Sequence, residues 1–401
     1  MNRRAALRGG AIVAVLIVTF VAGVYVDQAF PEYVPYFGHR SVGKVDLTEL
    51  QQAIRLVQAD YVDAGKVDST KLSHSTVQGL ISGLGDPFSA YFDPTQYKRL
   101  QESYQGAYSG IGIYLSFTTG YPVITGTVPG SPAASAGLTA GDQIFKVGDK
   151  DMNGVTSDQA TTLIQGPDGT KVTMEISRGG STFSVTLTRA EIHVPTVRSA
   201  EIGNQVLYVR IYQFGTEAET STLFASALST GLPGKKGIVL DLRGDPGGFI
   251  ATATDVISEF VASGETYELR DRSGTVERNQ VNGHPEAPTI PLVVLVDANS
   301  ASASEIVAGS LQVHQRAKLV GTVTYGKGSV QQDFELADGA DIHLTVKRWY
   351  LPNGQTIDHK GLTPDVTVTL PNPSDAYDVA SPSQGYAKDT QLNAALALLA
   401  G

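Results

Sequence analysis

PLVVLVDANSASASEIVAGSL, residues 291–311, joins an unbroken apolar run to a polar turn and then to a helical stretch. Strands that are buried on both faces of a sheet have continuous apolar runs of this kind. A second run, Gly237-Ile-Val-Leu-Asp-Leu242, is also followed by a glycine-rich turn and by a helical stretch over residues 249–261. This repetition of strand, turn and helix predicts an α/β core in which helices cover a mixed sheet.

The rest of the chain changes character twice. Apolar residues recur at spacings of three and four between residues 47 and 84, which predicts helices. Short β-branched runs separated by glycine turns then predict a small β-rich module. The expected parts are a tail with a membrane segment (1–26), a helical region (27–105), the β-rich module (106–190), the α/β core (191–370), and a linker with a terminal helix (371–401).

Composition excludes several functional classes. The 401 residues carry a formal charge of −10, whereas binding to nucleic acid needs a concentrated basic surface. We therefore expect no nucleic-acid partner. Cysteine is absent, which excludes disulfides and thiolate metal sites.

The amino terminus contains a candidate membrane segment. Arg3, Arg4 and Arg8 precede an uncharged, mainly apolar run over residues 9–26, which is about long enough to cross a bilayer. Positive charges before the run place the amino terminus in the cytoplasm. A cleaved signal peptide is the competing interpretation, but Ala22-Gly-Val24 is a poor cleavage site. The sequence predicts a single-pass protein of the inner or cytoplasmic membrane, with its bulk in the periplasm or outside the cell.

Two turns that directly follow buried strands can carry chemistry. In Asp241-Leu-Arg-Gly-Asp-Pro-Gly-Gly248, consecutive glycines let a substrate backbone approach closely, and no phosphate-loop motif is present. The other turn contains Ser300, Ser302 and Ser304 at the positive end of a predicted helix. Helix capping would need only one serine. Spacing alone does not choose among the three.

A lysine lies in a third glycine-rich turn, Thr324-Tyr-Gly-Lys-Gly-Ser329. A surface lysine in a loop is the ordinary interpretation of this pattern. Glycines on both sides allow the loop to turn the side chain of Lys327 inward, where burial lowers the pKa of an amine and makes it a base near neutral pH. A lysine can then activate a serine in place of a histidine.

Other catalytic arrangements are poorly supported. None of the seven histidines lies in a glycine-rich turn, and there is no G-x-S-x-G elbow. His314 is expected at a helix end, and His343 is expected to be a half-buried structural residue in a strand. No H-E-x-x-H motif or carboxylate–histidine cluster is apparent, so the sequence predicts neither a metal nor a cofactor.

The β-rich module contains a candidate peptide-binding loop. Gly110-Ile-Gly-Ile-Tyr-Leu115 leads from a glycine turn into an apolar strand, and such a loop can hold a terminal carboxylate with its backbone N–H groups. The later phrases Gly130-Ser-Pro-Ala-Ala-Ser-Ala-Gly-Leu138 and Gly141-Asp-Gln-Ile144 resemble those of PDZ domains.

From about Leu47 to Leu399 the chain resembles the carboxyl-terminal processing proteases, also called tail-specific proteases. The motifs that carry the resemblance occur in family order: Asp86-Pro-Phe-Ser89, the PDZ phrases, Asp241-Leu-Arg243 with Pro246-Gly-Gly248, Ser300-Ala-Ser-Ala-Ser-Glu305, Tyr325-Gly-Lys-Gly328 and Gly361-Leu-Thr-Pro-Asp365.

The resemblance implies roles for individual residues. It makes Ser302 the nucleophile, Lys327 the general base, and Gln331 the residue that orients the lysine. It also implies an oxyanion hole, formed by the backbone N–H groups of Ala303 and of Gly247 or Gly248. Asn299 and the pair Gly244-Asp245 depart from the family pattern, which leaves the sequence preference open.

The predicted function is that of a serine endopeptidase that processes or degrades extracytoplasmic proteins near their carboxyl termini. Gly110, Ile111, Gly112 and Ile113 would bind the apolar tail of a protein or peptide substrate. The membrane is the second expected partner, and a homo-oligomer remains open. Two alternatives are an inactive, membrane-anchored PDZ adaptor and an acyl transferase that uses a thioester cofactor. Intact Ser302, Lys327 and Gln331 argue against the adaptor.

Overall fold

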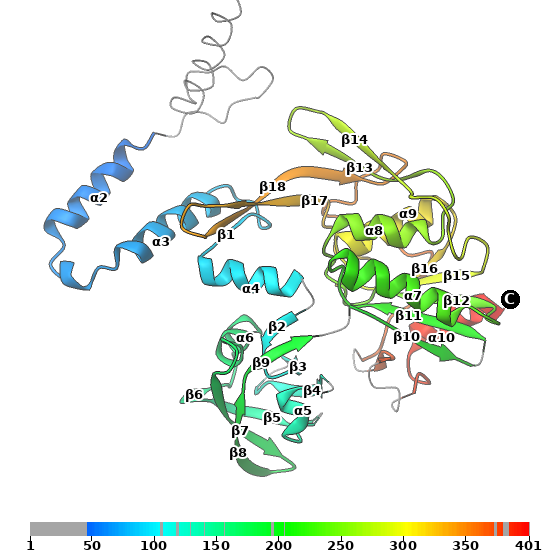
Figure 1. The fold of residues 1–401 in the computed structure, drawn as a ribbon, viewed down its shortest axis with the longest axis horizontal. Coiled ribbons are helices and arrows are strands. Elements are labelled where there is room, and N and C mark those ends of the chain that lie inside the picture. The colour runs from blue at the N-terminus through cyan, green and yellow to red at the C-terminus, as the bar shows by residue number, and fades with distance from the viewer. Residues whose placement is uncertain are drawn as a thin grey trace, which may run out of the picture. The chain divides into compact units, whose positions relative to one another are not determined.

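The computed structural model describes most of the chain after residue 45 (Figure 1). Compact packing divides the chain into two units, residues 1–66 with 272–275, and residues 67–271 with 276–401. The described residues are 46–104, 107–117, 120–128, 130–139, 141–155, 157–193, 196–203, 205–372, 375–379 and 385–400.

In the first unit the chain forms α2 (Thr48–Asp60) and the short 3₁₀ helix η2 (Ala64–Lys66). The carboxylate of Asp46 accepts a hydrogen bond of 2.9 Å from the backbone N–H of Thr48 and so satisfies one free donor at the start of α2. The helix follows the three-and-four spacing of apolar residues in the sequence.

The α/β core contains a six-stranded sheet in the order β10-β11-β12-β15-β16-β19. All neighbouring pairs are parallel except β10 with β11. The strands are β10 (Val197–Ile202), β11 (Val206–Ile211), β12 (Gly237–Asp241), β15 (Leu292–Val296), β16 (Lys318–Gly321) and β19 (Val366–Thr367). The mixed sheet is the one expected from the sequence.

Helices cover both faces of this sheet (Figure 1). Val294 and Val296 belong to the same apolar cluster as α7 (Thr222–Gly231), α8 (Ile250–Ser258) and α9 (Ala303–Val313). The alternate residues Val293 and Leu295 contact the cluster of α10 (Thr390–Ala400) on the opposite face. Burial on both faces explains why β15 is apolar at every position.

A second sheet has the order β1-β18-β13-β14, and β17 also pairs with β18. Its strands are β1 (Ala90–Phe92), β13 (Glu265–Asp271), β14 (Val276–Gln280), β17 (Ser329–Glu335) and β18 (Asp341–Tyr350). The helices α3 (Ser69–Ser82) and α4 (Pro94–Tyr104) flank β1 along the chain. β17 and β18 form the hairpin that the sequence predicts around Asp338 and Gly339.

The β-rich module has a sheet in the order β3-β4-β5-β7-β8, and Ile124, Ile144 and Met174 lie in its separate core. Its elements are β2 (Ala107–Gly110), β3 (Ile113–Ser116), β4 (Val123–Thr127), α5 (Pro132–Ser135), β5 (Gln143–Val147), β6 (Lys150–Asp151), α6 (Ser157–Ile164), β7 (Lys171–Arg178), β8 (Ser181–Thr188) and β9 (Ala190–His193). β2 pairs with β9 at the base of the module. β3 is an edge strand of this sheet, in which β6 also pairs with β5.

The predicted membrane location is corrected by the structure. Among the residues that the structure describes, no helix is long and apolar enough to cross a bilayer. The longest described helix, α3, has 14 residues and spans about 21 Å, whereas a hydrocarbon core is about 30 Å thick. The candidate anchor at residues 9–26 lies outside the described residues.

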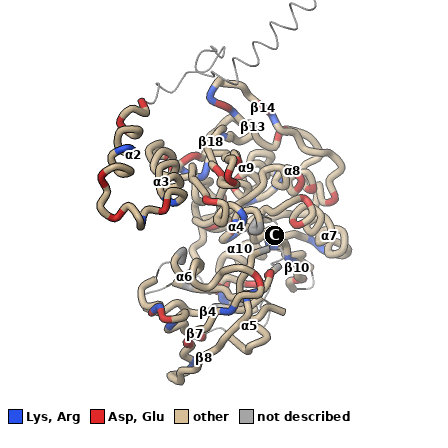
Figure 2. The backbone as a smooth tube through the Cα atoms, turned by 60° about the vertical axis from the view of Figure 1, so that its left-hand side comes forward, with Lys and Arg blue, Asp and Glu red and all other residues tan. Residues whose placement is uncertain are grey.

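Acidic and basic positions are intermixed along the described elements (Figure 2). One group of charges is nevertheless fully buried. Arg243, two residues after β12, contacts Asp241 at 2.5 Å and Asp389 at 2.9 Å, and it donates to the side chain of Gln391 at 3.1 Å. Although burial opposes ionisation, Arg243 and Arg210 hold the pKa of Asp241 below its ordinary value. The network ties the start of α10 to the sheet.

We expect Asp389→Ala to lower the free energy of unfolding by about 3 kcal/mol, because it leaves part of the buried guanidinium of Arg243 without a partner. Urea denaturation followed by circular dichroism measures the change. The matched control is Glu201→Ala, which breaks the exposed ion pair with Lys235 and costs less than about 1 kcal/mol. Equal losses in the two variants would contradict a structural role for the buried network.

Candidate active site

The serine turn is a sharp connection between β15 and α9. Ser302 precedes α9 directly and has φ 55° and ψ −116°. Non-glycine residues rarely adopt this backbone conformation, which costs on the order of 1–3 kcal/mol and persists only where the surroundings impose it. The strand, turn and helix therefore present Ser302 in a strained conformation at the positive end of the helix dipole.

The structure distinguishes the three serines. The hydroxyl of Ser300 donates to the carbonyl of Leu242 at 2.7 Å, and that of Ser304 donates to the carbonyl of Asp245 at 3.1 Å. Both side chains are fully buried, whereas Ser302 keeps 7% of its surface exposed. The hydroxyl of Ser302 donates to no acceptor among the described residues. Of the three serines, only Ser302 has a hydroxyl proton that no described acceptor takes, although its oxygen faces the backbone N–H of Glu305 in a capping box.

Glycine on both sides of Lys327 is required by close backbone contacts. Gly326 has φ 90°, and a Cβ atom there would lie 2.8 Å from the backbone nitrogen of Gly361. A Cβ atom on Gly328 would lie 2.6 Å from the Cβ of Asp358. The lysine loop thus sits directly against residues 358–361, of which Gly361 begins the motif Gly361-Leu-Thr-Pro-Asp365.

The carboxylate of Glu305, in the first turn of α9, joins the serine turn to the lysine loop. Its Oε2 accepts the backbone N–H groups of Ser302 and Lys327, each at 2.9 Å. Its Oε1 accepts the N–H of Gly326 at 2.7 Å and the hydroxyl of Thr324 at 2.5 Å. The backbone nitrogens of Ser302 and Lys327 are therefore no farther apart than twice 2.9 Å.

Glu305 is fully buried. Burial raises its pKa, while the four hydrogen bonds that it accepts favour the charged form. Sequence analysis included Glu305 in a motif but assigned it no role. Its role could have been suggested by its position three residues after Ser302, because Glu is common at this position of a capping box at the start of a helix.

The ammonium group of Lys327 lies in a half-buried, partly aromatic environment. Its Nζ is 5.2 Å from the centre of the Phe88 ring, which forms a T-shaped pair with the ring of Tyr325 at a centroid distance of 6.4 Å. Burial lowers the pKa of Lys327, and the charges of Asp86 and Glu305 partly oppose this effect. Nζ forms no ion pair or hydrogen bond with another described residue. The side chain is thus available to accept a proton.

Phe88 was missed as a site residue, although its motif was noted. The carboxylate of Asp86 accepts the N–H of Phe88 at 3.1 Å and the hydroxyl of Ser89 at 2.7 Å. The backbone N–H of Thr345, on β18, donates to the same hydroxyl at 3.0 Å. These bonds hold the turn against the second sheet and so place Phe88 beside the lysine.

Gln331, which the resemblance assigns to orienting the lysine, makes its side-chain hydrogen bonds to two hydroxyl groups. Its amide donates to the hydroxyls of Ser329 at 2.9 Å and Thr345 at 3.0 Å. No hydrogen bond joins it to Lys327 within the described part of the chain. In this structure Gln331 links β17 to β18 immediately after the lysine loop.

The predicted oxyanion donors lie around the serine. A Cβ atom on Gly247 would be 2.8 Å from the backbone nitrogen of Ala303 and 2.8 Å from the Cβ of Ser302. The N–H of Gly247, however, donates to the carboxylate of Asp245 at 2.8 Å. The N–H groups of Gly248 and Ala303 have no acceptor among the described residues. Of the two glycines, Gly248 is therefore the one with a free donor.

A groove in the β-rich module contains three of the four predicted peptide-binding residues. It has a volume of about 210 Å³ and lies between β3 and α6, with Ile111, Gly112 and Ile113 on one side and Ile164 on the other. Gly110 precedes the groove and faces the ring of Tyr108. Because β3 is an edge strand, an extended peptide can pair with it.

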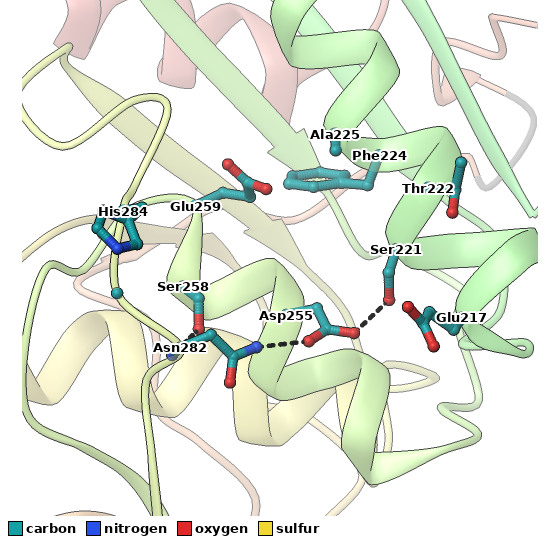
Figure 3. Close-up of a pocket in the computed structure, with 11 residues that line it drawn as sticks. Glu217, Ser221, Thr222, Phe224, Ala225, Asp255, Ser258, Glu259, Asn282 and His284 are labelled. Atoms are coloured by element: carbon teal, nitrogen blue, oxygen red, sulfur yellow. Dashed lines mark hydrogen bonds between the residues drawn. The ribbon is translucent and has the colours of Figure 1, made fainter.

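Another pocket, of about 280 Å³, is lined by the π-helical turn η3 (Glu217–Ser221) and by α7 and α8 (Figure 3). Asp255 accepts a hydrogen bond from the hydroxyl of Ser221 at 2.5 Å and another from the amide of Asn282 at 2.7 Å. Burial raises the pKa of Glu259 in the same pocket. None of the predicted site residues lines this pocket.

Comparison with known proteins finds three matching family profiles. Peptidase family S41 matches residues 205–368, the PDZ domain profile matches 123–178, and the profile of the activating protease CtpB N-terminal domain matches 36–95. The first two matches lie in the α/β core with the second sheet and in the β-rich module.

Individual relatives cover most of the chain. A probable CtpA-like serine protease of Staphylococcus aureus (strain MSSA476) is 32% identical over 365 residues, which are 90% of this chain and 71% of that protein. The carboxy-terminal processing protease CtpA of Bacillus subtilis (strain 168) is 34% identical over 334 residues, 83% of this chain and 71% of that protein. A solved photosystem II D1 C-terminal processing protease has a TM-score of 0.53 and 26% identity, covering 80% of this chain and 87% of that one.

Asp245, beside the serine turn, is a buried carboxyl group with one unsatisfied oxygen. It is fully buried, its Oδ1 accepts the N–H of Gly247, and its Oδ2 has no hydrogen-bond partner among the described residues. Burial raises the pKa of Asp245 well above its ordinary value. The folded protein thus holds this proton more tightly than the unfolded chain does.

We expect Asp245→Asn to stabilise the protein more at pH 8 than at pH 5. A raised pKa in the folded state means that stability is present at acid pH and is lost as pH rises from the unfolded value of about 3.9 toward the folded value. The uncharged amide avoids this loss, so its advantage in the free energy of unfolding should grow between pH 5 and pH 8.

Urea denaturation at the two pH values measures the difference. The exposed Asp63→Asn substitution is the control, and its effect should change little between them. An Asp245→Asn advantage that is equal at pH 5 and pH 8 would show that Asp245 ionises without cost.

Proposed function

Because the chain belongs to peptidase family S41, as a serine protease of the carboxyl-terminal processing type with a PDZ domain, we propose that Ser302 and Lys327 form its catalytic dyad. The predictions of family, fold class and enzyme class are confirmed by this membership. The dyad is supported chiefly by one observation: a single oxygen of Glu305 accepts the backbone N–H groups of both residues.

In the proposed reaction, neutral Lys327 removes the proton of the Ser302 hydroxyl as its oxygen attacks the scissile carbonyl. The N–H groups of Ala303 and Gly248 stabilise the negative charge that develops on the carbonyl oxygen. The amine leaves with a proton from Lys327, and water then hydrolyses the acyl-enzyme. The lowered pKa of Lys327 supports its role as the base, because it raises the neutral fraction near pH 7.

We also propose that the PDZ groove binds the carboxyl-terminal tail of a protein or peptide substrate. The tail would extend the sheet along β3, its carboxylate would meet the loop at Ile111 and Gly112, and an apolar side chain would enter the groove toward Ile164. Gly112 has φ 75°, and a Cβ atom there would lie 2.2 Å from the Cβ of Ser131. The loop conformation therefore depends on glycine.

We expect Lys327→Arg to lose at least nine-tenths of the peptidase activity, because arginine keeps the charge but does not deprotonate near neutral pH. In the unmodified enzyme, the rate should rise with pH through the lowered pKa of Lys327. Ser302→Ala should be nearly inactive, and the double variant should lose little more than either single one.

Initial rates on a protein substrate measure these losses, and circular dichroism verifies folding. The Lys360→Arg substitution is the matched control and should keep full activity, because Lys360 has an exposed side chain in the segment that packs against the lysine loop. A folded Lys327→Arg enzyme that retained more than about a tenth of the activity, a barrier increase below about 1.4 kcal/mol, would refute Lys327 as the base.

For the tail-binding proposal, amidating the carboxyl terminus of a peptide substrate should lower kcat/KM by about ten-fold, since it removes a charge that accepts loop hydrogen bonds. Gly112→Ala should have a similar effect on free-acid peptides and abolish the difference between the two substrates. Gly126→Ala is the matched control, because its Cβ would make only an ordinary 3.6 Å contact. Equal turnover of both peptides by the unmodified enzyme would show that the groove serves another purpose.

A further inference from the structure

Three potential metal ligands meet in the hairpin of β17 and β18. Asp333 lies on β17 directly opposite His343, and Asp341 lies two residues before His343 on β18. Residues two apart on a strand point to the same face. One ligand atom from each of the three residues lies within 4.8 Å of the other two. We call Asp333, Asp341 and His343 the hairpin site.

Asp341 is the most unusual member of this group. It is fully buried, and neither carboxylate oxygen has a hydrogen-bond partner among the described residues. The backbone N–H of Phe334 favours the charged form of the Asp341 carboxylate. It does not, however, reach hydrogen-bond geometry with either oxygen of that carboxylate. An ionised carboxylate in this state is much less stable than in water unless a positive charge compensates it.

Neighbouring residues make the environment more negative. No Lys or Arg among the described residues forms an ion pair with Asp333, Asp341 or Glu335. The phenol of Tyr97, on α4, lies close enough to these three carboxylates that their charges, in addition to burial, raise its pKa. The imidazole of His343 contacts Asp333 through Nδ1, which leaves Asp341 without a partner.

The scaffold around the hairpin site restricts its movement. β1 pairs with β18 at the same positions, with Ala90 opposite His343 and Phe92 opposite Asp341. The rings of Phe92 and His343 form a T-shaped pair at a centroid distance of 6.1 Å. Three strands thus contribute to a site whose ligands need little rearrangement to converge on an ion.

We propose that the hairpin site binds a divalent transition-metal ion, most suitably Zn²⁺, through Asp333, Asp341 and His343. Zn²⁺ accepts carboxylate oxygens and imidazole nitrogens at about 2.0–2.2 Å, whereas Ca²⁺ and Mg²⁺ prefer oxygen ligands alone. Water completes the coordination. The ion supplies the positive charge that Asp341 lacks and displaces the direct contact between Asp333 and His343.

Such an ion would act as a structural clamp. It would join β17 to β18, and β18 is also held to β1 by strand pairing. β1 follows the turn that carries Phe88, and β17 begins two residues after Lys327. Sequence analysis found no carboxylate–histidine cluster because the ligands come together only when the hairpin forms.

Full-length protein without a histidine tag, first treated with EDTA and then dialysed, tests the proposal. Titration with ZnCl₂ followed by calorimetry should show one saturable site, and Zn²⁺ should raise Tm by roughly 3 °C or more. Asp341→Asn, which keeps the shape of the side chain, should bind Zn²⁺ at least about ten-fold more weakly, a loss seen even for residues that only orient a ligand. In the Asp341→Asn variant, Zn²⁺ should no longer raise Tm.

Asp338→Asn is the matched control, because it removes the negative charge from the separate 3.0 Å contact between Asp338 and His74 and leaves the three residues of the hairpin site unchanged. It should retain the Zn²⁺ effect, and Co²⁺ absorption in the unmodified protein should show a nitrogen–oxygen ligand set that Asp341→Asn lacks. If the unmodified protein binds no Zn²⁺ at saturation, a proton rather than a metal compensates Asp341. Unchanged Zn²⁺ binding in Asp341→Asn would show that any bound ion is adventitious. Either result overturns the proposal.

Discussion

The buried carboxylate of Glu305 is the constraint on which the active site depends. It accepts four hydrogen bonds from two segments that are about twenty residues apart in the chain. A buried acceptor with four donors has one favourable position, since each lost bond leaves a buried polar group unsatisfied. Its place in the first turn of α9 is itself set by the helix. Glu305 thereby converts the regular geometry of α9 into a defined separation between Ser302 and Lys327, and it helps to sustain the strained backbone of Ser302.

The parallel sheet supplies the rest of the geometry. β12 and β15 are neighbours and run in the same direction, so the glycine turn after one meets the serine turn after the other at a common edge. The contact is so close that a side chain on Gly247 would overlap Ser302 and Ala303. The second sheet brings the third component, because the indole of Trp349 donates to the carbonyl of Lys327 at 2.8 Å. The residues of the proposed catalytic site come from three loops, and two sheets position these loops.

Two buried acids illustrate how surroundings decide chemistry. Asp245 lies among backbone donors and hydroxyl groups beside the serine turn, and a neutral acid or amide suits that environment. Asp341 instead faces another carboxylate and an imidazole, which is the kind of environment that stabilises a cation. Both groups have an oxygen without a partner, yet the neighbouring polar atoms favour different compensation. Burial alone would not distinguish them.

Sequence by itself determined the α/β core, the hairpin and the β-rich module, because each depends on local periodicity and turn residues. Its motifs also led to Ser302 and Lys327 through family resemblance, but spacing left three serines equivalent. Only tertiary structure decided that Ser300 and Ser304 donate to carbonyls of the neighbouring turn and that Gln331 bonds to Thr345. The links through Glu305, the contact of Phe88 with Lys327 and the convergence at Asp341 arise from residues far apart in the chain. The spacing of residues within a strand or helix predicts which face of that element a side chain lies on. The residues that the side chain contacts depend instead on how separate elements pack against one another.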